Sequence, residues 1–216
     1  MTTAVQHPRG TEDAPDRYPQ PPSRWMSEEE FVRWAVANRV RAEWVDGEVI
    51  MMAPSNTDHA DLNTWLSGLM RGYVEKRELG LIILDVFTRL SEPAPQLRVP
   101  DILFVDKARL EIVKGTRIEG APDLIVEIVS PDSQARDWRE KFTVYQAAGV
   151  REYWILDPIG RSVEPHSLTP RGYERISEID GRINSNVIAG WYLRPTWLWR
   201  QPRPAIFDLL REYGIA

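Results

Sequence analysis

The segment that most constrains the fold is an apolar run that carries acidic residues, 122–130 (PDLIVEIVS). Its aliphatic and β-branched side chains are typical of a strand buried in a sheet. Glu127 lies inside this run, where an unpaired charge would cost several kcal/mol. A structural ion pair would explain Glu127, but we favour a functional acid.

Helix-like and strand-like segments alternate around this run. Residues 26–38 predict a helix with Ser27 as its N-cap, and residues 41–52 predict a hairpin that turns at Asp46-Gly47. Next come the longest predicted helix, 55–80, three strand-like runs, 81–91, 98–106 and 122–130, a second long helix, 135–149, and a strand, 151–158. A short helical patch, 107–113, precedes the third run. This order predicts an α/β fold in which a mixed sheet is flanked by helices, α-β-β-β-α-β, after an N-terminal hairpin.

The length of 216 residues is sufficient for one domain with a substantial core. Residues 1–24 are polar and rich in proline, so we expect a disordered arm, then a single domain over 25–207 and a C-terminal tail over 208–216. No apolar run approaches the roughly 20 residues that span a membrane, and no secretory signal is recognisable. The chain has no cysteine, which excludes disulfides and thiolate zinc sites and is compatible with the expected cytoplasmic location.

The net charge of −5 counts against a nucleic-acid binder, because contacts from Lys and Arg to phosphates supply most of the non-specific affinity. An acidic total still allows a local basic face. We expect such a face around Arg136, Arg139 and Lys141, with binding that weakens strongly as salt rises.

Asp101 is the acid that can cooperate with Glu127. Residues four apart on one strand, such as Asp123 and Glu127, have Cα atoms roughly 13 Å apart, too far to share one metal ion. Asp101 lies in the preceding strand-like run, and neighbouring strands are only about 4.8 Å apart. If these strands pair, Asp101 and Glu127 converge, and oxygen ligands without His or Cys suit Mg²⁺ or Mn²⁺. The alternative is that Asp101 is only a turn or strand-start residue.

Lys141 is the candidate cation. The second long helix carries an apolar stripe at spacings of four and three residues, formed by Trp138, Phe142 and Tyr145. At about 100° per residue, Lys141 lies at the edge of this buried face, whereas Glu140 is expected to point away. The alternative is a surface lysine that pairs with Asp137, four residues earlier.

Together these residues resemble the Uma two family of endonuclease-like proteins, within the PD-(D/E)xK restriction-endonuclease-like superfamily. The resemblance covers about residues 25–207 and is carried by AEWVDGEVI, APSNTDHADLN, VPDILFV and the long segment 122–158. It implies a restriction-endonuclease-like core, with Asp101 as the Asp of PD and Glu127 as the acid of (D/E)xK. Val129 stands where the superfamily has its lysine, and Lys141 on the following helix takes that place.

The resemblance implies metal-assisted hydrolysis of DNA phosphodiester bonds. Asp101 and Glu127 would hold Mg²⁺ or Mn²⁺, and Lys141 would orient water or stabilise charge on the phosphate. Glu43 and His59 match family positions that border the site, although a histidine near a helix N-terminus is also commonly a neighbour of the cap or a surface residue. A homodimer is expected, because cutting both strands commonly needs two active sites. The alternative function is a catalytically inactive nucleic-acid-binding or assembly module on the same fold.

Overall fold

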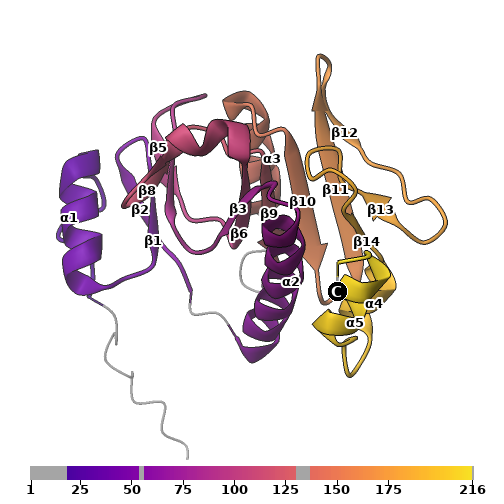
Figure 1. The fold of residues 1–216 in the computed structure, drawn as a ribbon. Coiled ribbons are helices and arrows are strands. Elements are labelled where there is room, and N and C mark those ends of the chain that lie inside the picture. The colour runs from indigo at the N-terminus through magenta and orange to yellow at the C-terminus, as the bar shows by residue number, and fades with distance from the viewer. Residues whose placement is uncertain (1–18, 54–55, 130–136, 216) are drawn as a thin grey trace, which may run out of the picture.

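The computed structural model describes residues 19–53, 56–129 and 137–215. Within them the chain forms two six-stranded sheets and a small two-stranded ribbon, with helices packed against the sheets (Figure 1). No helix in these described ranges combines the length and apolar character needed to cross a membrane. The architecture is the mixed α/β fold that the sequence predicts.

The first sheet lies at the N-terminal side of the molecule and is covered by helix α1 (Glu28–Asn38) (Figure 1). Its strand order is β2 (Glu48–Met51), β1 (Ala42–Val45), β5 (Gln96–Arg98), β4 (Phe87–Leu90), β8 (Arg117–Glu119) and β7 (Val113–Lys114). Ser27 caps α1 as predicted and forms a capping box with Glu30. The β1–β2 hairpin turns at Asp46 and Gly47, whose φ angles of 46° and 97° suit the Asp-Gly pair.

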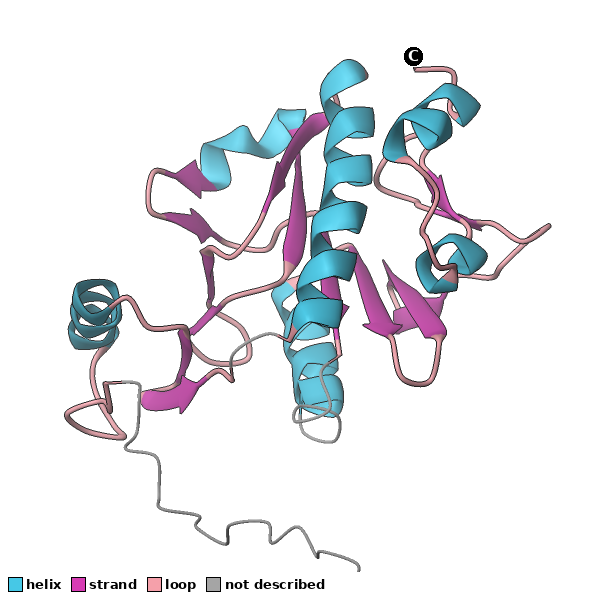
Figure 2. Cartoon of the chain, turned by 90° about the horizontal axis from the view of Figure 1, so that it is seen from below, coloured by secondary structure: helices cyan, strands magenta, loops and turns pink. Residues whose placement is uncertain are grey.

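The central strands of the second sheet are buried on both faces. Its order is β12 (Gly172–Arg175), β11 (Ser162–Thr169), β10 (Glu152–Asp157), β9 (Leu124–Ile128), β6 (Ile102–Asp106) and β3 (Gly80–Ile83). Alternate residues of β9 enter two separate hydrophobic clusters, Val126 packing with helix α2 (Thr57–Lys76) and Ile125 with helix α3 (Asp137–Ala148). Figure 2 shows α2 crossing in front of this sheet. Two covered faces explain why the strands read as continuous apolar runs.

The predicted core order is confirmed, because α2, β3, β6, β9, α3 and β10 follow one another as α-β-β-β-α-β around the second sheet. The remaining strands between α2 and α3 belong to the first sheet. The predicted patch 107–113 is the 3₁₀ helix η1 (Lys107–Ile112).

Two predicted segments differ from the structure. The run 81–91 is not one strand: β3 and β4 join different sheets, and the chain changes direction at Asp85, whose φ is 52°. The longest helix ends at Lys76 rather than near Gly80, and Gly80 begins β3 instead. Gly80 has φ 155°, and a Cβ there would lie 2.1 Å from the carbonyl oxygen of Val105, so close strand pairing requires glycine.

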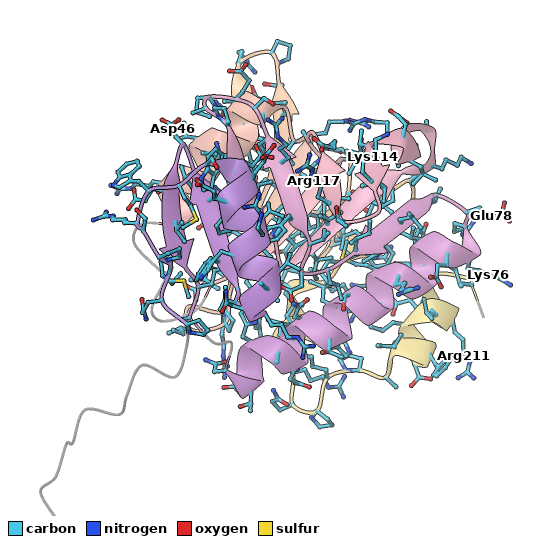
Figure 3. All side chains as sticks on the ribbon, turned by 90° about the vertical axis from the view of Figure 1, so that its left-hand side faces the viewer. Asp46, Lys76, Glu78, Lys114, Arg117 and Arg211 are labelled. Atoms are coloured by element: carbon cyan, nitrogen blue, oxygen red, sulfur yellow. The ribbon has the colours of Figure 1, made fainter. Side chains whose placement is uncertain are left out.

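The C-terminal region packs against α2 and the second sheet. It contains β13 (Ile183–Asn184), β14 (Tyr192–Leu193), α4 (Pro195–Trp199) and α5 (Ile206–Glu212). Helix α5 runs along α2, with Ile206 beside Gly68 and Leu210 beside Gly72. In Figure 3, Arg211 of α5 lies near Lys76 at the end of α2. Leu209 and Tyr213 belong to the core, so the boundary predicted at 207 falls inside a packed helix.

Candidate functional site

A cluster of buried polar side chains lies where the two sheets, α2 and α3 meet. The first sheet supplies Glu43 and Arg98, the second sheet supplies Glu127 and, directly before β6, Asp101, and the helices supply His59, Lys141 and Tyr145. Each of these residues is between 0% and 8% exposed. Buried polar groups at this density need partners, and the contacts among them define the site.

Asp101 and Glu127 converge because β6 and β9 pair as the sequence analysis required. Ile102 lies opposite Val126 in the antiparallel register, which brings Asp101 to the end of β9 that carries Glu127. Oδ2 of Asp101 accepts the backbone N–H of Ile128 at 2.8 Å. This bond fixes the carboxylate of Asp101 next to Glu127, so Asp101 does more than begin a strand.

Lys141 reaches this pair from α3. Its Nζ lies 3.1 Å from Oε1 of Glu127 and 3.5 Å from Oε1 of Glu43. Lys141 is 5% exposed, so the alternative of a surface lysine is wrong. The side chain of Asp137, its suggested partner, lies outside the described residues, as does Arg136 of the expected basic face.

Glu43 and Arg98 form a buried ion pair beside Lys141. Because Trp44 pairs with Leu97, Glu43 lies opposite Arg98 on the neighbouring strand, and Nη1 of Arg98 donates to Oε2 of Glu43 at 2.9 Å. The other oxygen of Glu43 accepts the backbone N–H of Val99 at 3.1 Å. Both oxygens of Glu43 are therefore engaged by the protein.

The contacts of Arg98 show that the prediction for Glu140 is wrong, and Arg98 itself is a site residue that the sequence analysis missed. Its Nη2 donates to Oε1 of Glu140 at 2.5 Å, so Glu140 does not point away from the site as expected. Arg98 was not singled out from the sequence. It lies in the apolar stretch LRV, and a buried charge is costly unless it is paired, so a buried arginine needs carboxylate partners as Glu127 needs cations. The position of an arginine between apolar residues was the signal that could have identified it.

Tyr145 is a second residue that the sequence analysis missed. It was assigned to the apolar stripe of the helix, but its hydroxyl donates to Oε1 of Glu127 at 2.7 Å. Lys141 and Tyr145 are four residues apart, so they lie on one face of α3 and reach the same carboxylate. This spacing was the signal that could have linked them.

His59 connects the N-terminus of α2 to Asp101. Its Nε2 lies 3.2 Å from Oδ2 of Asp101, and its backbone N–H donates to the side chain of Asn56, the N-cap. His59 is buried, so the alternative of a surface residue is wrong. Its Nδ1 has no hydrogen-bond partner within the described part of the chain.

The surroundings of the acids in the cluster shift their pKa values in opposite directions. Burial raises the pKa of Glu127 to about 7, and the charges of Asp101 and Glu43 add to this rise while Lys141 opposes it. Burial also acts to raise the pKa of Glu43, but Lys141 and Arg98 outweigh it and hold this pKa below its ordinary value. The hydrogen bond to Asp101 raises the pKa of His59 in spite of its burial. Glu127 is therefore the acid whose charge the site stabilises least.

Two carboxylate oxygens of the site remain available to a ligand. Both hydrogen bonds to Asp101 go to Oδ2, and both to Glu127 go to Oε1. Among the described residues, Oδ1 of Asp101 and Oε2 of Glu127 accept no hydrogen bond, and no three His, Asp or Glu side chains come together as a complete metal site. Two carboxylates fit Mg²⁺, which is usually held by one or two acids with water and substrate phosphate completing its shell.

Asp123 lies at the other end of β9 and takes no part in this site. Its carboxylate accepts the backbone N–H of Asp106 at 2.8 Å and is paired with Arg109 at 2.8 Å and Arg151 at 3.0 Å. The expectation that it cannot share a metal with Glu127 agrees with this arrangement.

Comparison with known proteins identifies the family. The Uma2 ("Uma two") family, described as "Putative restriction endonuclease", matches residues 28–195. Two uncharacterized proteins of Synechocystis sp. are similar to this chain: slr1290 is 25% identical over 138 residues, covering 64% of this chain and 71% of that protein, and sll1609 is 24% identical over 132 residues, covering 57% and 70%.

A solved structure shows the same fold. It is the crystal structure of a putative nuclease belonging to DUF820 from Anabaena variabilis, with a TM-score of 0.63, 19% sequence identity and coverage of 74% of this chain and 90% of that one. The match to the family extends from α1 to the start of α4 and includes every residue of the buried cluster. The chain therefore belongs to the Uma2 family of putative restriction endonucleases.

Proposed function

We propose that this protein is a metal-dependent endonuclease that hydrolyses phosphodiester bonds of DNA, with Asp101, Glu127 and Lys141 as its catalytic residues. The observation that carries the proposal is that the carboxylates of Asp101 and Glu127 lie together, each with one oxygen left for a ligand. The Nζ of the buried Lys141 lies 3.1 Å from Oε1 of Glu127. Membership of a family described as "Putative restriction endonuclease" supports the same reaction class.

Asp101 and Glu127 would hold Mg²⁺ or Mn²⁺ through Oδ1 and Oε2, the oxygens that the described residues leave available. When bound, the ion supplies positive charge that polarises the phosphate and lowers the pKa of a bound water. His59 and the N–H of Ile128 fix the orientation of Asp101, and Tyr145 fixes that of Glu127. Hydrogen bonds of this kind orient metal-binding carboxylates in other proteins.

Lys141 would place its ammonium against the scissile phosphate, where it orients the attacking water or stabilises negative charge in the transition state. Glu43, itself held by Arg98, and Glu127 keep the ammonium in position. The lysine of the superfamily motif is replaced by Val129, which packs against a hydrophobic cluster instead. Lys141 thus takes the cationic role from a different element.

Nicking of supercoiled plasmid tests this function. We expect the wild type to cut with Mg²⁺ or Mn²⁺ and not with EDTA, and both Glu127→Gln and Lys141→Met to abolish cutting. Lys76→Met is the matched control, because Lys76 is exposed at the far end of α2 (Figure 3) and the same side-chain change there leaves the site intact. Far-UV circular dichroism and thermal unfolding verify that each variant is folded.

Two outcomes would overturn the proposal. A folded wild type that cuts no DNA with either metal would favour the inactive nucleic-acid-binding or assembly module. Cutting that persists in Glu127→Gln would show that the active site lies elsewhere or that the activity is a contaminant.

We further propose that the protein acts as a homodimer in the cytoplasm. The second sheet ends at β3, and Leu81 and Leu84 in and beside this edge strand are 40% and 43% exposed. An edge strand with exposed apolar side chains can pair with a second chain. Light scattering coupled to size exclusion should give the mass of a dimer, and a monomer at micromolar concentration would contradict this part of the proposal.

A further inference from the structure

Helix α2 carries two buried polar atoms that lack a hydrogen bond. Nδ1 of His59 and Oδ1 of Asn63 are both shielded from solvent, and neither has a partner among the described residues. Buried polar atoms in folded proteins are nearly always bonded to other protein atoms or to an ordered water. Two such atoms, four residues apart on one helix, therefore favour a common explanation.

The geometry of the helix places His59 and Asn63 on one side of α2. Residues four apart on an α-helix differ by about 40° around the axis and by about 6 Å along it. Helical side chains lean toward the N-terminus, so the side chain of Asn63 leans back over the turn that begins at His59. No direct hydrogen bond joins the two side chains in the described structure.

The contact of His59 with Asp101 determines what Nδ1 can do. Oδ2 of Asp101 lies 3.2 Å from Nε2 of His59. A carboxylate oxygen accepts hydrogen bonds, so Nε2 carries the proton, and Nδ1 of the neutral ring is left as an acceptor. Oδ1 of Asn63 is an acceptor as well. One water molecule can join two neighbouring acceptors, because it donates one hydrogen to each.

We propose that Asn63 is a positioning residue that holds His59, through one bound water, in the orientation that donates to Asp101. The water would donate to Nδ1 of His59 and to Oδ1 of Asn63, so the neutral ring keeps its proton on Nε2. Hydrogen-bonded partners of this kind fix the ring and the tautomer of histidines at metal sites. The inference deepens the proposed function and rests on it for the consequence that Asp101 binds a metal ion.

NMR of the imidazole groups tests the contact in EDTA, without metal or DNA. The chain has three histidines, so the Nε2–H signal of His59 can be assigned by its loss in His59→Gln. Asn63→Leu keeps the shape of asparagine without an acceptor, and Asn63→Ala removes the same acceptor with less bulk. Asn184→Leu, at an exposed residue of β13, is the matched control.

We expect the Nε2–H proton of His59 to exchange with solvent at least about 10-fold faster in both Asn63 variants than in the wild type, because the ring opens more often. Asn184→Leu should leave this rate unchanged. The signals of His166, whose ring packs against Phe142, serve as an internal reference and should not respond to any of the substitutions. Thermal unfolding of each variant verifies that the fold is retained.

Binding of Mn²⁺ alone, followed by electron paramagnetic resonance, tests the consequence for Asp101. His59→Gln provides the second background of a double-mutant cycle, because the glutamine amide can still donate to Asp101 but has no equivalent of Nδ1. We expect Asn63→Leu to weaken Mn²⁺ binding about 5-fold in the wild-type background and less than about 2-fold in His59→Gln. A substitution that acts only on packing would weaken binding equally in both backgrounds.

The results that overturn this inference differ from those that overturn the nuclease. Unchanged exchange of the Nε2–H proton in the Asn63 variants would overturn the inference, even if the wild type binds metal and cuts plasmid. An equal loss of Mn²⁺ affinity in both backgrounds would also overturn it, because Asn63 would then act without His59. If exchange accelerates in the Asn63 variants but the wild type neither binds Mn²⁺ nor cuts DNA, the contact with His59 stands and the nuclease proposal fails.

Discussion

Strand β9 has a buried acid near each of its ends, and the two acids have opposite surroundings. Asp123, directly before the strand, is bound by two arginines and a backbone N–H. Glu127, near the end of the strand, is bound by Lys141 and Tyr145 but has the carboxylates of Asp101 and Glu43 as neighbours. Both lie in one apolar segment, yet only Asp123 has more cations than acids around it.

The difference separates a structural acid from a functional one. The partners of Asp123 satisfy its charge and tie together η1, β6 and the start of β10. At Glu127, burial raises the pKa to about 7 and the neighbouring carboxylates add to this rise. Such an arrangement costs stability and is characteristic of sites that bind a cation or move a proton. A buried acid is therefore interpreted from its neighbours, because burial is common to both.

The largest expected effect is that substitution of Glu127 lowers activity, whereas substitution of Asp123 lowers stability. Glu127→Gln should lower the rate of metal-dependent nicking at least about 100-fold, the scale on which single charge-stabilising groups act. Asp123→Asn should cut within about 3-fold of wild type below its melting temperature but lose about 2 kcal/mol of unfolding free energy, because its arginines are partly exposed and recover solvation. Nicking rates and urea denaturation measure both quantities.

The comparison would fail if Asp123→Asn, shown to be folded at the assay temperature, lost activity as severely as Glu127→Gln. In that case both ends of β9 would contribute to the reaction. Urea titrations at the assay temperature provide the control for folding.

Arg98→Met should cause the next largest effect, a loss of about 3–5 kcal/mol in the free energy of unfolding. Arg98 is 1% exposed, and its removal leaves the buried Glu43 with Lys141 as the one nearby cation among the described residues. Arg71→Met, at a residue exposed on α2, is the control and should change stability by less than about 0.5 kcal/mol. A small loss in Arg98→Met would mean that the cluster tolerates an unbalanced acid.

The raised pKa of Glu127 predicts a pH-dependent difference in stability. The folded protein holds the proton of Glu127 up to about pH 7, whereas the unfolded chain releases it near 4.5. The contribution of Glu127 to the free energy of unfolding of the wild type is fully present below pH 4.5 and is lost as the pH rises to 7. Glu127→Gln has no titrating group at this position and shows no such loss. The variant should therefore gain on the order of 3 kcal/mol relative to wild type between pH 4.5 and 8 in metal-free buffer.

Urea denaturation at a series of pH values measures this gap. Asp123→Asn, measured in parallel, distinguishes the effect of Glu127 from that of any buried acid on β9. A gap between wild type and Glu127→Gln that stays constant with pH would contradict the raised pKa.

The smallest expected effect is that of Tyr145→Phe. It removes one hydrogen bond to Oε1 of Glu127 and leaves the ring packed against Tyr153, so the unfolding free energy should fall by about 1 kcal/mol. Nicking should slow by less than about 10-fold, because Lys141 still orients the carboxylate. Tyr153→Phe, on the other ring of the pair, is the control, and equal effects on nicking would deny Tyr145 any specific role at Glu127.

The sequence determined the core order, and it singled out the two strands whose pairing would bring Asp101 to Glu127. The cap at Ser27, the turn at Asp46-Gly47 and the end of α3 before Gly149 depend on local chemistry, and the apolar run 122–130 places Glu127 in a buried strand. The family resemblance carried by these segments is confirmed. Local propensity and periodicity are properties of neighbouring residues, so a single sequence contains them.

The tertiary structure decided which side chains complete the cluster. Arg98 binds Glu43, 55 residues away, and Glu140, 42 residues away, and β3 and β4 separate into different sheets although they belong to one apolar run. The position of Lys141 depends on how α3 lies against β9. The same packing allows Lys141 to supply the positive charge that Val129, at the lysine position of the superfamily motif, does not. Periodicity specifies the face of an element but not what packs against that face, because that choice is made by contacts between segments far apart in the chain.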